Sequence, residues 1–185
     1  YSESGLHHEC CLLGICGVQD AANLAYYGLH ALQHRGQQGC GIVSVDPEGE
    51  FRRFRGDGLV TEVFNESMIS KLQGNMAIGH VRYSNAKCKG TENIQPFLFH
   101  HNSGDFAMAN NGQIVNYLQL RNELEDKGSL FQSSSDAEVI AHLIKKQGTD
   151  KTLPRIHSIK AALNMIDGAF AFVIMTARRI YACRD

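Results

Sequence analysis

The sequence predicts one α+β domain in which strands and helices stack in layers. Apolar runs of strand length fill most of the first half of the 185 residues, helix signals gather in the second half, and two further apolar runs close the chain. Separate blocks of strands and helices are typical of α+β proteins. A chain of this length fills one hydrophobic core of ordinary size, and its sequence shows no linker or repeat.

The first elements are a strand and a helix. Residues 10–17, CCLLGICG, form a short apolar run bounded by glycine, which predicts a buried strand. Asp20 is expected to cap the next helix, which would end near the HRG at 34–36. The buried stripe expected on this helix consists of Leu24, Gly28, Ala31 and Leu32.

Four more strands are expected before the second block of helices. They are residues 39–45, 50–55, 76–83 and 105–109. A turn that contains Pro47 and Gly49 would join the first two of them. The stretch 87–97 contains a glycine and a proline, so we expect it to be irregular.

Helix signals return after these strands. Asn116 with Gln119 resembles a capping box, and Gly128 stands where that helix would stop. Ser135 with Glu138 has the pattern of a second capping box. The buried faces expected of the two helices are Tyr117, Leu120 and Leu124, and Val139, Ile140, Leu143 and Ile144.

One more helix and two strands complete the predicted domain. Residues 155–166 are expected to form the helix, and residues 168–176 and 178–185 the strands. The first of these strands is almost entirely apolar, so we expect it in the middle of a sheet.

The composition excludes several classes of function. Lys and Arg total 18 against 19 Asp and Glu, which gives a formal net charge of -1. Without a basic excess, binding to nucleic acid or to an anionic membrane is not expected. The longest apolar stretch, 168–176, is far shorter than the ~20 residues of a membrane helix. The polar start YSESGLHHE lacks the apolar core of a secretory signal, so the expected location is the cytoplasm.

Six cysteines stand at positions 10, 11, 16, 40, 88 and 183. Free thiols are expected, because nothing indicates secretion and the chain is long enough to form a core without disulfides. A zinc site is not expected, because no C-x-x-C is present and neighbours in HHECC point to opposite faces of an extended chain. The sequence therefore predicts no metal ligands.

Five polar segments stand at strand or loop ends, where functional residues concentrate on a rigid scaffold. They are Cys10, HRG at 34–36, HVRY at 80–83, NNG at 110–112 and SSSD at 133–136. They supply a thiol, two guanidinium groups, amide donors and a carboxylate. This set could hold and cleave a small amide that carries its own carboxylate and ammonium groups, a description that fits glutamine.

The same segments, in the same order, resemble the class II glutamine amidotransferases. HECCLLGICG is similar to the start of that family, and LQHRGQQGCGIV, GDGLVTEVF, GHVRYS, NNGQIVN and SSSDAEVIAHLI resemble its amidophosphoribosyltransferase branch. The resemblance implies an Ntn-hydrolase fold, a four-layer αββα sandwich of two mostly antiparallel sheets. It also implies hydrolysis of L-glutamine to glutamate and ammonia, with ammonia passed to phosphoribosyl pyrophosphate in the first step of purine synthesis.

The resemblance assigns the reacting groups. Cys10 would be the nucleophile, although a cysteine on a strand is also an ordinary buried apolar residue, and Cys11 stands beside it. Asn111 and Gly112 would form the oxyanion hole, and the same Asn-Gly pair is also a common signal for a tight turn.

The resemblance also assigns the groups that bind glutamine. Arg82 would bind the α-carboxylate, with a surface ion pair as its alternative role. Asp136 would bind the α-ammonium, although a carboxylate at a helix start is also stabilised by the helix dipole. Arg35 would shape the pocket of the nucleophile. Asn85 and Asn110 stand where the family has threonine and histidine.

The resemblance further implies how the chain is organised. Residues 1–9 would be a propeptide or leader, removed to free the α-amine of Cys10. Residues 10–185 would be an incomplete amidotransferase domain, truncated before its last strands and lacking the phosphoribosyltransferase domain. Magnesium and, in some members, an iron-sulfur cluster would belong to that missing domain, so no cofactor is expected in this segment. The expected partners are L-glutamine, the phosphoribosyltransferase domain and further copies of the chain in a homo-oligomer.

Two alternatives stay open on the sequence alone. One is a catalytically silent binding or regulatory module with the same fold. Departures from the family pattern favour it, at Cys11, Cys16, Ser84, Asn85 and Asn110. The other is the glutaminase domain of a different ammonia-using synthase. An active glutaminase is the preferred interpretation, because every residue expected at the reacting amide has the right chemistry.

Overall fold

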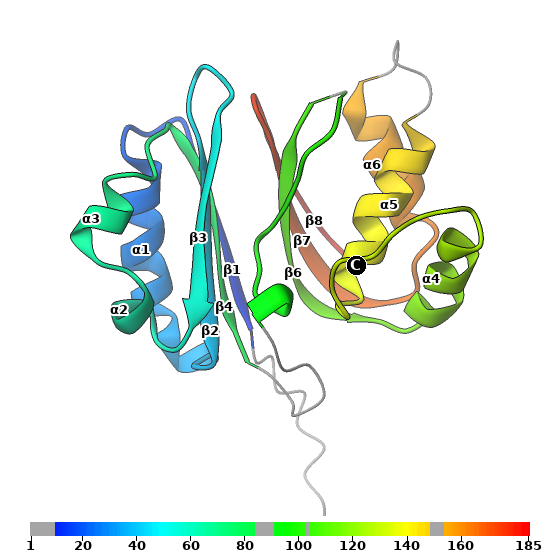
Figure 1. Ribbon diagram of the computed structural model, residues 1–185, viewed down its shortest axis with the longest axis horizontal. Helices are drawn as coiled ribbons and strands as arrows, with labels where there is room; N and C mark the ends of the chain where they lie inside the picture. The colour runs from blue at the N-terminus through cyan, green and yellow to red at the C-terminus, as the bar shows by residue number, and fades with distance from the viewer. Residues whose placement is uncertain (1–9, 84–90, 103, 149–153) are drawn as a thin grey trace, which may run out of the picture.

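The computed structural model describes residues 10–83, 91–102, 104–148 and 154–185. Two four-stranded antiparallel sheets pack face to face, and helices cover the outer face of each (Figure 1). The predicted four-layer αββα sandwich is therefore confirmed. The propeptide expected at 1–9 lies outside the described residues.

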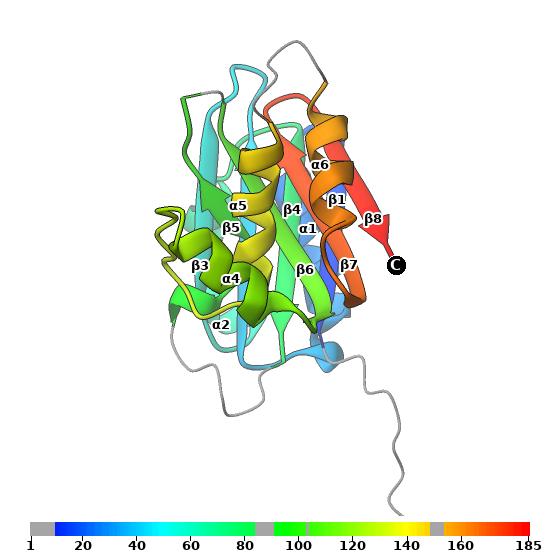
Figure 2. The same ribbon diagram turned by 90° about the vertical axis from the view of Figure 1, so that its right-hand side faces the viewer.

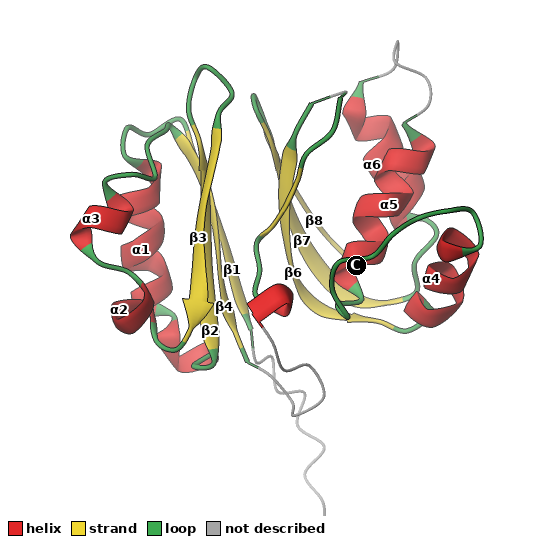
Figure 3. Cartoon of the chain, in the orientation of Figure 1, coloured by secondary structure: helices red, strands yellow, loops and turns green. Residues whose placement is uncertain are grey.

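The first sheet holds the beginning of the chain. Its strands, in order across the sheet, are β1 (Cys11–Cys16), β4 (Met76–Arg82), β2 (Gly39–Val45) and β3 (Phe51–Asp57). Its outer face is covered by α1 (Ala21–Ala31), α2 (Val60–Val63) and α3 (Glu66–Ile69) (Figure 3). A 3-10 helix, η1 (Gln33–Arg35), leads from α1 toward β2. The register pairs Cys11 with Val81 and Gly39 with Arg82, so the start of β1 and the end of β4 are neighbours.

The second sheet is built from the later half of the chain. Its strands, in order, are β5 (Phe97–Phe99), β6 (Phe106–Ile114), β7 (Gly168–Thr176) and β8 (Ile180–Arg184). Helices α4 (Tyr117–Glu125), α5 (Ala137–Gln147) and α6 (Arg155–Leu163) cover its outer face (Figure 2). The central position expected for residues 168–176 is confirmed, since β7 lies between β6 and β8. None of the helices in the described ranges is long and apolar enough to cross a bilayer.

A hydrophobic core fills the space between the sheets. Its buried members are Val43, Val45, Met76, Ile78, Ala107, Val173 and Met175. Successive side chains of a strand point to opposite faces, so Ala77 and Val81 of β4 pack beneath α1 while Ile78 points at the other sheet. His80 and Arg82 have the parity of Ile78 and share its inward face.

The buried face of α1 differs from the predicted stripe. The face against the sheet consists of Ala21, Ala22, Ala25 and Leu29, whereas Leu24 is 46% exposed. The helix carries apolar residues on more than one side, and the alanine side is the one that lies close to the strands. The capping role of Asp20 is also wrong, because its backbone is left-handed (φ 56°) and its side chain makes no capping bond.

Neither predicted capping box forms, because the Asn116 and Glu138 side chains bond other segments of the chain. The Asn116 side chain donates to the Met165 carbonyl oxygen and accepts from the Asp167 N–H, each at 3.0 Å. Glu138 is buried and accepts from the main chain of Gln132 and Ser133. The buried faces expected for α4 and α5 are otherwise confirmed, with Tyr117 only partly buried.

Of the stretch 87–97 that was expected to be irregular, residues 87–90 lie outside the described residues, and the rest holds a short helix and the first residue of a strand. A 3-10 helix, η2 (Thr91–Asn93), leads into β5, whose three residues pair with β6 from Phe106 to Met108. Three residues are too few to show a strand period, which is why the sequence did not indicate this strand.

Replacing Ile78 by alanine tests the packing between the sheets. Its side chain is fully buried, so the change should lower the free energy of unfolding by about 2–5 kcal/mol in urea denaturation. Leu118→Ala on α4 is the control, because Leu118 is 59% exposed and the expected change is below about 0.5 kcal/mol. Equal losses at the two positions would contradict the buried interface.

Candidate active site

The predicted nucleophile lies where the two sheets meet at one end of the sandwich. Cys10 directly precedes β1, and its carbonyl oxygen accepts a hydrogen bond from Asn111 Nδ2 at 3.0 Å. Asn111 belongs to β6 of the other sheet. Two segments separated by about a hundred residues of sequence are therefore joined at this point.

Two arginine segments flank Cys10. Arg35 Nε donates to the same Cys10 carbonyl oxygen at 3.3 Å. The next residue, Gly36, packs so closely on β4 that a Cβ there would lie 2.7 Å from the carbonyl carbon of Arg82. The Tyr83 N–H, just after β4, donates to Cys10 Sγ at 3.4 Å. The structure therefore brings Cys10, Arg35 and the end of β4 at Arg82 together.

Strand alternation separates the two adjacent cysteines. Cys11 is 8% exposed and packs in the core beneath α1. Burial raises the pKa of its thiol, and the nearby Arg35 charge only partly opposes this effect. Cys10 points to the opposite face and is half-buried. Of the two thiols, only that of Cys10 contacts the main chain of Tyr83 at the end of β4.

The Asn-Gly pair lies inside a strand, so the tight-turn interpretation is wrong. Asn111 pairs with Ala171 and Gly112 with Phe170 in the β6–β7 ladder. Gly112 has φ 125°, and a Cβ at this position would lie 2.1 Å from the Ala169 carbonyl oxygen. A glycine is required here by the close approach of β7 rather than by a turn.

The carboxylate of Asp136 holds the C-terminal end of β6. Asp136 Oδ2 accepts from the Ile114 N–H at 2.8 Å, and this side chain does not cap α5. Burial raises the pKa of the Asp136 carboxyl, although the hydrogen bond from Ile114 opposes the shift. Asp136 therefore holds β6 at Ile114, two residues beyond Gly112 along the strand.

The N–H groups of alternate residues face one edge of β6. The Asn110 N–H bonds Gln95 Oε1 at 2.6 Å, and the Ile114 N–H bonds Asp136. The alternation of an extended strand directs the Gly112 N–H to the same edge, between these two. Gly112 is exposed to solvent. The strand thus offers an amide donor beside the Asn111 side chain.

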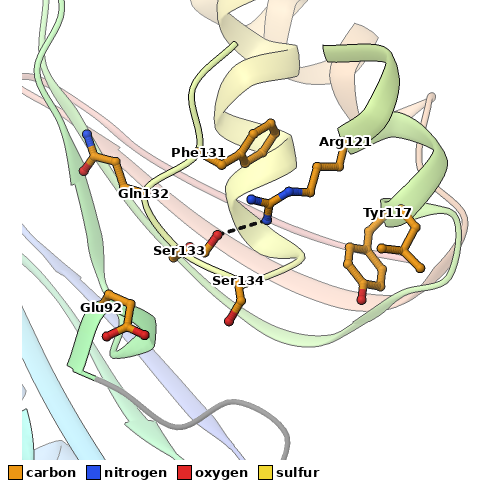
Figure 4. Close-up of a pocket in the computed structure, with 8 residues that line it drawn as sticks. Glu92, Tyr117, Arg121, Phe131, Gln132, Ser133 and Ser134 are labelled. Atoms are coloured by element: carbon orange, nitrogen blue, oxygen red, sulfur yellow. Dashed lines mark hydrogen bonds between the residues drawn. The ribbon is translucent and has the colours of Figure 1, made fainter. Parts of the chain in front are cut away.

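A hollow of about 470 Å³ lies next to the SSSD segment (Figure 4). The Arg121 guanidinium lies 4.3 Å from the centre of the Phe131 ring and donates to the Ser133 carbonyl oxygen at 3.0 Å. Glu92 of η2 lines its other side. Cys10 does not line it, so the hollow adjoins the predicted site without containing the nucleophile.

Some site features were missed from the sequence. Gln95 contacts Asn110, and no periodicity or motif had marked it. Tyr83 belongs to the HVRY segment, but the contact of its main chain with Cys10 was not predicted. Asn85, which departs from the family pattern, lies outside the described residues. In the described part of the chain, no three His, Cys, Asp or Glu side chains gather as a metal site would require.

Comparison with known proteins identifies relatives across the whole chain. Residues 80–185 match the family model of a glutamine amidotransferase domain. The amidophosphoribosyltransferase of Bacillus subtilis strain 168 is 50% identical over 98% of this chain, which spans 37% of that protein. The amidophosphoribosyltransferase of Lacticaseibacillus casei is 45% identical over 100% of this chain and 94% of that protein.

Solved structures have the same fold. The glutamine phosphoribosylpyrophosphate amidotransferase of B. subtilis with ADP and GMP matches with a TM-score of 0.86 and 47% identity, over 94% of this chain and 37% of that one. The allosteric regulatory enzyme of purine biosynthesis matches with a TM-score of 0.88 and 48% identity over the same shares. A predicted glutamine amidotransferase from Pseudomonas aeruginosa, at 15% identity and a TM-score of 0.56, shares the fold.

Gly112→Ala tests the close approach of β7 to the site. Gly128→Ala is the matched control, because Gly128 also has a positive φ (88°) but has no atom within 4 Å of an added Cβ. Backbone strain should cost about 1–3 kcal/mol at either position. Gly112→Ala should cost more in urea denaturation, since the Ala169 carbonyl must also move. Equal losses would mean that β7 does not constrain Gly112.

Proposed function

We propose, from the premise that this chain belongs to the amidophosphoribosyltransferase family and carries its glutamine amidotransferase domain, that it hydrolyses L-glutamine with Cys10 as the nucleophile. The observation that carries the proposal is the 3.0 Å bond from Asn111 Nδ2 to the Cys10 carbonyl oxygen. This bond sets an amide donor beside a thiol, at the end of the sandwich where Arg35 and Arg82 also lie.

The proposed reaction passes through a thioester. The Cys10 thiolate attacks the side-chain amide carbon of glutamine, and the carbonyl electrons move onto oxygen to form a tetrahedral oxyanion. The C–N bond then breaks, and the nitrogen leaves as ammonia with the proton taken from the thiol. Water hydrolyses the thioester, which releases glutamate and restores the thiol.

Asn111 and Gly112 are the proposed donors to the oxyanion. An amide nitrogen carries two hydrogens, so Asn111 Nδ2 can bond the Cys10 carbonyl oxygen with one and the oxyanion with the other. The Gly112 N–H faces the same edge of β6 as the N–H groups bound by Gln95 and Asp136. Both donors are therefore attached to a strand that is held on either side of Gly112.

The charged residues are proposed to bind the two ends of glutamine. The Arg82 guanidinium suits the α-carboxylate, because its planar fork pairs with two carboxylate oxygens. Asp136 is proposed to bind the α-ammonium. Its carboxylate is already fixed by Ile114, and an ammonium group would offset the charge that burial disfavours. Arg35 fixes the main chain of Cys10 and shapes its pocket.

The α-amine of Cys10 is the proposed base, which requires removal of residues 1–9. One observation and one general principle support this role. Arg35 and Asn111 both bond the carbonyl oxygen of Cys10, so they fix the main chain that carries the amine and leave the thiol outside these bonds. A base built into the same residue as the nucleophile stays within reach of its proton.

The proposal extends to the whole protein of which this domain is a part. The relatives named amidophosphoribosyltransferase support phosphoribosyl pyrophosphate as the acceptor of the ammonia, bound by a separate domain. Any magnesium or iron-sulfur requirement is assigned to that domain. A homo-oligomer is part of the same proposal. Five described cysteines carry free thiols, which suits a reducing compartment such as the cytoplasm.

Cys10→Ala and Cys11→Ala form a matched pair that tests the nucleophile. Cys10→Ala should lower the rate of glutamate release by about 10³-fold or more, because the attacking atom is lost. Cys11→Ala should keep most of the wild-type rate, because its thiol packs beneath α1. Circular dichroism shows that both variants are folded. The reverse result would move the nucleophile by one residue, and a wild type without activity would favour the silent module.

Arg82→Lys tests the binding of the α-carboxylate. Lysine cannot form the two parallel hydrogen bonds of a guanidinium, so KM for glutamine should rise about 10- to 100-fold with a smaller change in kcat. Arg121→Lys is the control, because Arg121 pairs with Glu125 beside the hollow next to the SSSD segment, which Cys10 does not line. Steady-state kinetics of glutamine hydrolysis give both constants. An unchanged KM in Arg82→Lys would assign Arg82 to a surface ion pair.

A further inference from the structure

A buried histidine joins the two sheets beside the oxyanion donors. His80 lies on the inward face of β4 and is 1% exposed. Its Nε2 lies 3.1 Å from the carbonyl oxygen of Asn110 in β6. Because a carbonyl oxygen only accepts, the ring carries a proton on Nε2 and donates it. Burial lowers the pKa of His80 to about 4, so the ring is neutral near pH 7.

Gln95 holds the same residue from another side. Its Oε1 accepts from the Asn110 N–H at 2.6 Å, and its Nε2 donates to Asn110 Oδ1 at 3.0 Å and to the Asn110 carbonyl oxygen at 3.4 Å. The register of β5 and β6 pairs Phe97 with Met108, and its continuation sets residue 95 opposite residue 110. The Gln95 side chain therefore makes the bonds that the main chain of a longer β5 would have made.

These bonds hold β6 at the point where its strand neighbour ends. β5 pairs with β6 only between Phe106 and Met108, and the oxyanion donors come three and four residues later. Asn110 is the residue directly before them, and its N–H and carbonyl groups are both taken by His80 and Gln95. A rotation of the Asn110 peptide would turn the Asn111 side chain relative to Cys10.

We infer that His80 is a positioning residue of the proposed glutaminase. Together with Gln95, it fixes the Asn110 main chain. This main chain in turn aims the Asn111 and Gly112 donors at the oxyanion. The inference rests on the proposed function. Oxyanion donors act over a narrow range of distances, and a displacement of about 1 Å in an active site can cost about 10²-fold in rate. His80 touches neither glutamine nor the thiol in this account, so its effect is on kcat through geometry.

The test compares His80→Ala with His80→Gln in glutamine hydrolysis by the purified protein. His80→Ala should lower kcat by about 10- to 100-fold and leave KM for glutamine within about two-fold, because the substrate ends are bound by other residues. Glutamine can present an amide N–H close to the position of the histidine Nε2, so His80→Gln should recover most of the rate. Iodoacetamide should alkylate Cys10 equally fast in both variants.

Ile78→Ala is the matched control, because Ile78 lies two residues away on the same inward face of β4 and is also buried. It should lose stability without the fall in kcat. If His80→Ala does not fold, Gln95→Glu tests the same point, because it keeps the shape and removes the N–H that Asn110 accepts. Its kcat should fall in the same way.

The outcomes separate this inference from the proposed function. A wild-type protein that does not hydrolyse glutamine overturns both. A wild type that hydrolyses glutamine, together with an unchanged kcat in His80→Ala or in Gln95→Glu, overturns the positioning role alone. The positioning role is also overturned if Ile78→Ala lowers kcat as much as His80→Ala does, or if His80→Gln recovers none of the lost rate.

Discussion

The geometry of the site depends on one hydrogen bond that spans the gap between the sheets, from Asn111 Nδ2 to the carbonyl oxygen of Cys10. The first sheet carries the proposed nucleophile, and the second carries the proposed oxyanion donors. Neither sheet alone contains both. The two sheets that this 3.0 Å bond joins are packed against each other by the central core, which includes Val43 and Val173. The candidate site is therefore built across the two sheets and not within either one.

Strand alternation decides which groups meet at that end. Inward-facing positions bring Cys10, His80 and Arg82 to the space between the sheets, and the intervening residues go into the core beneath α1. One residue of shift in β1 would replace Cys10 by Cys11 at the site. The antiparallel pairing of Cys11 with Val81 is therefore a condition for the proposed mechanism as well as for the fold.

Most of the fold was predictable because its elements have strong local patterns. The apolar run of β7 indicated a central strand, and the faces of α4 and α5 follow from their helical period. The predictions that failed concern residues whose bonding partners are distant in the sequence. Asn116 bonds the chain near Met165 instead of capping α4, and Asn111 and Gly112 lie in a strand because β7 pairs with them. A sequence window contains no information on such partners.

The motifs predicted which residues make up the candidate site. They did not predict the residues that hold the site in place. The assigned groups at Cys10, Arg35 and Asn111 are in direct contact, and Asp136 holds the same strand as Asn111. Gln95 and His80 act through tertiary bonds to Asn110 that no spacing rule indicates. The central claim is most directly tested by labelling the purified protein with a diazo-ketone analogue of glutamine and mapping the modified peptide. The account predicts alkylation of Cys10 Sγ that excess glutamine prevents, with the exposed Cys16 unmodified. Modification at Cys11, or no protected modification in a folded protein, would contradict it.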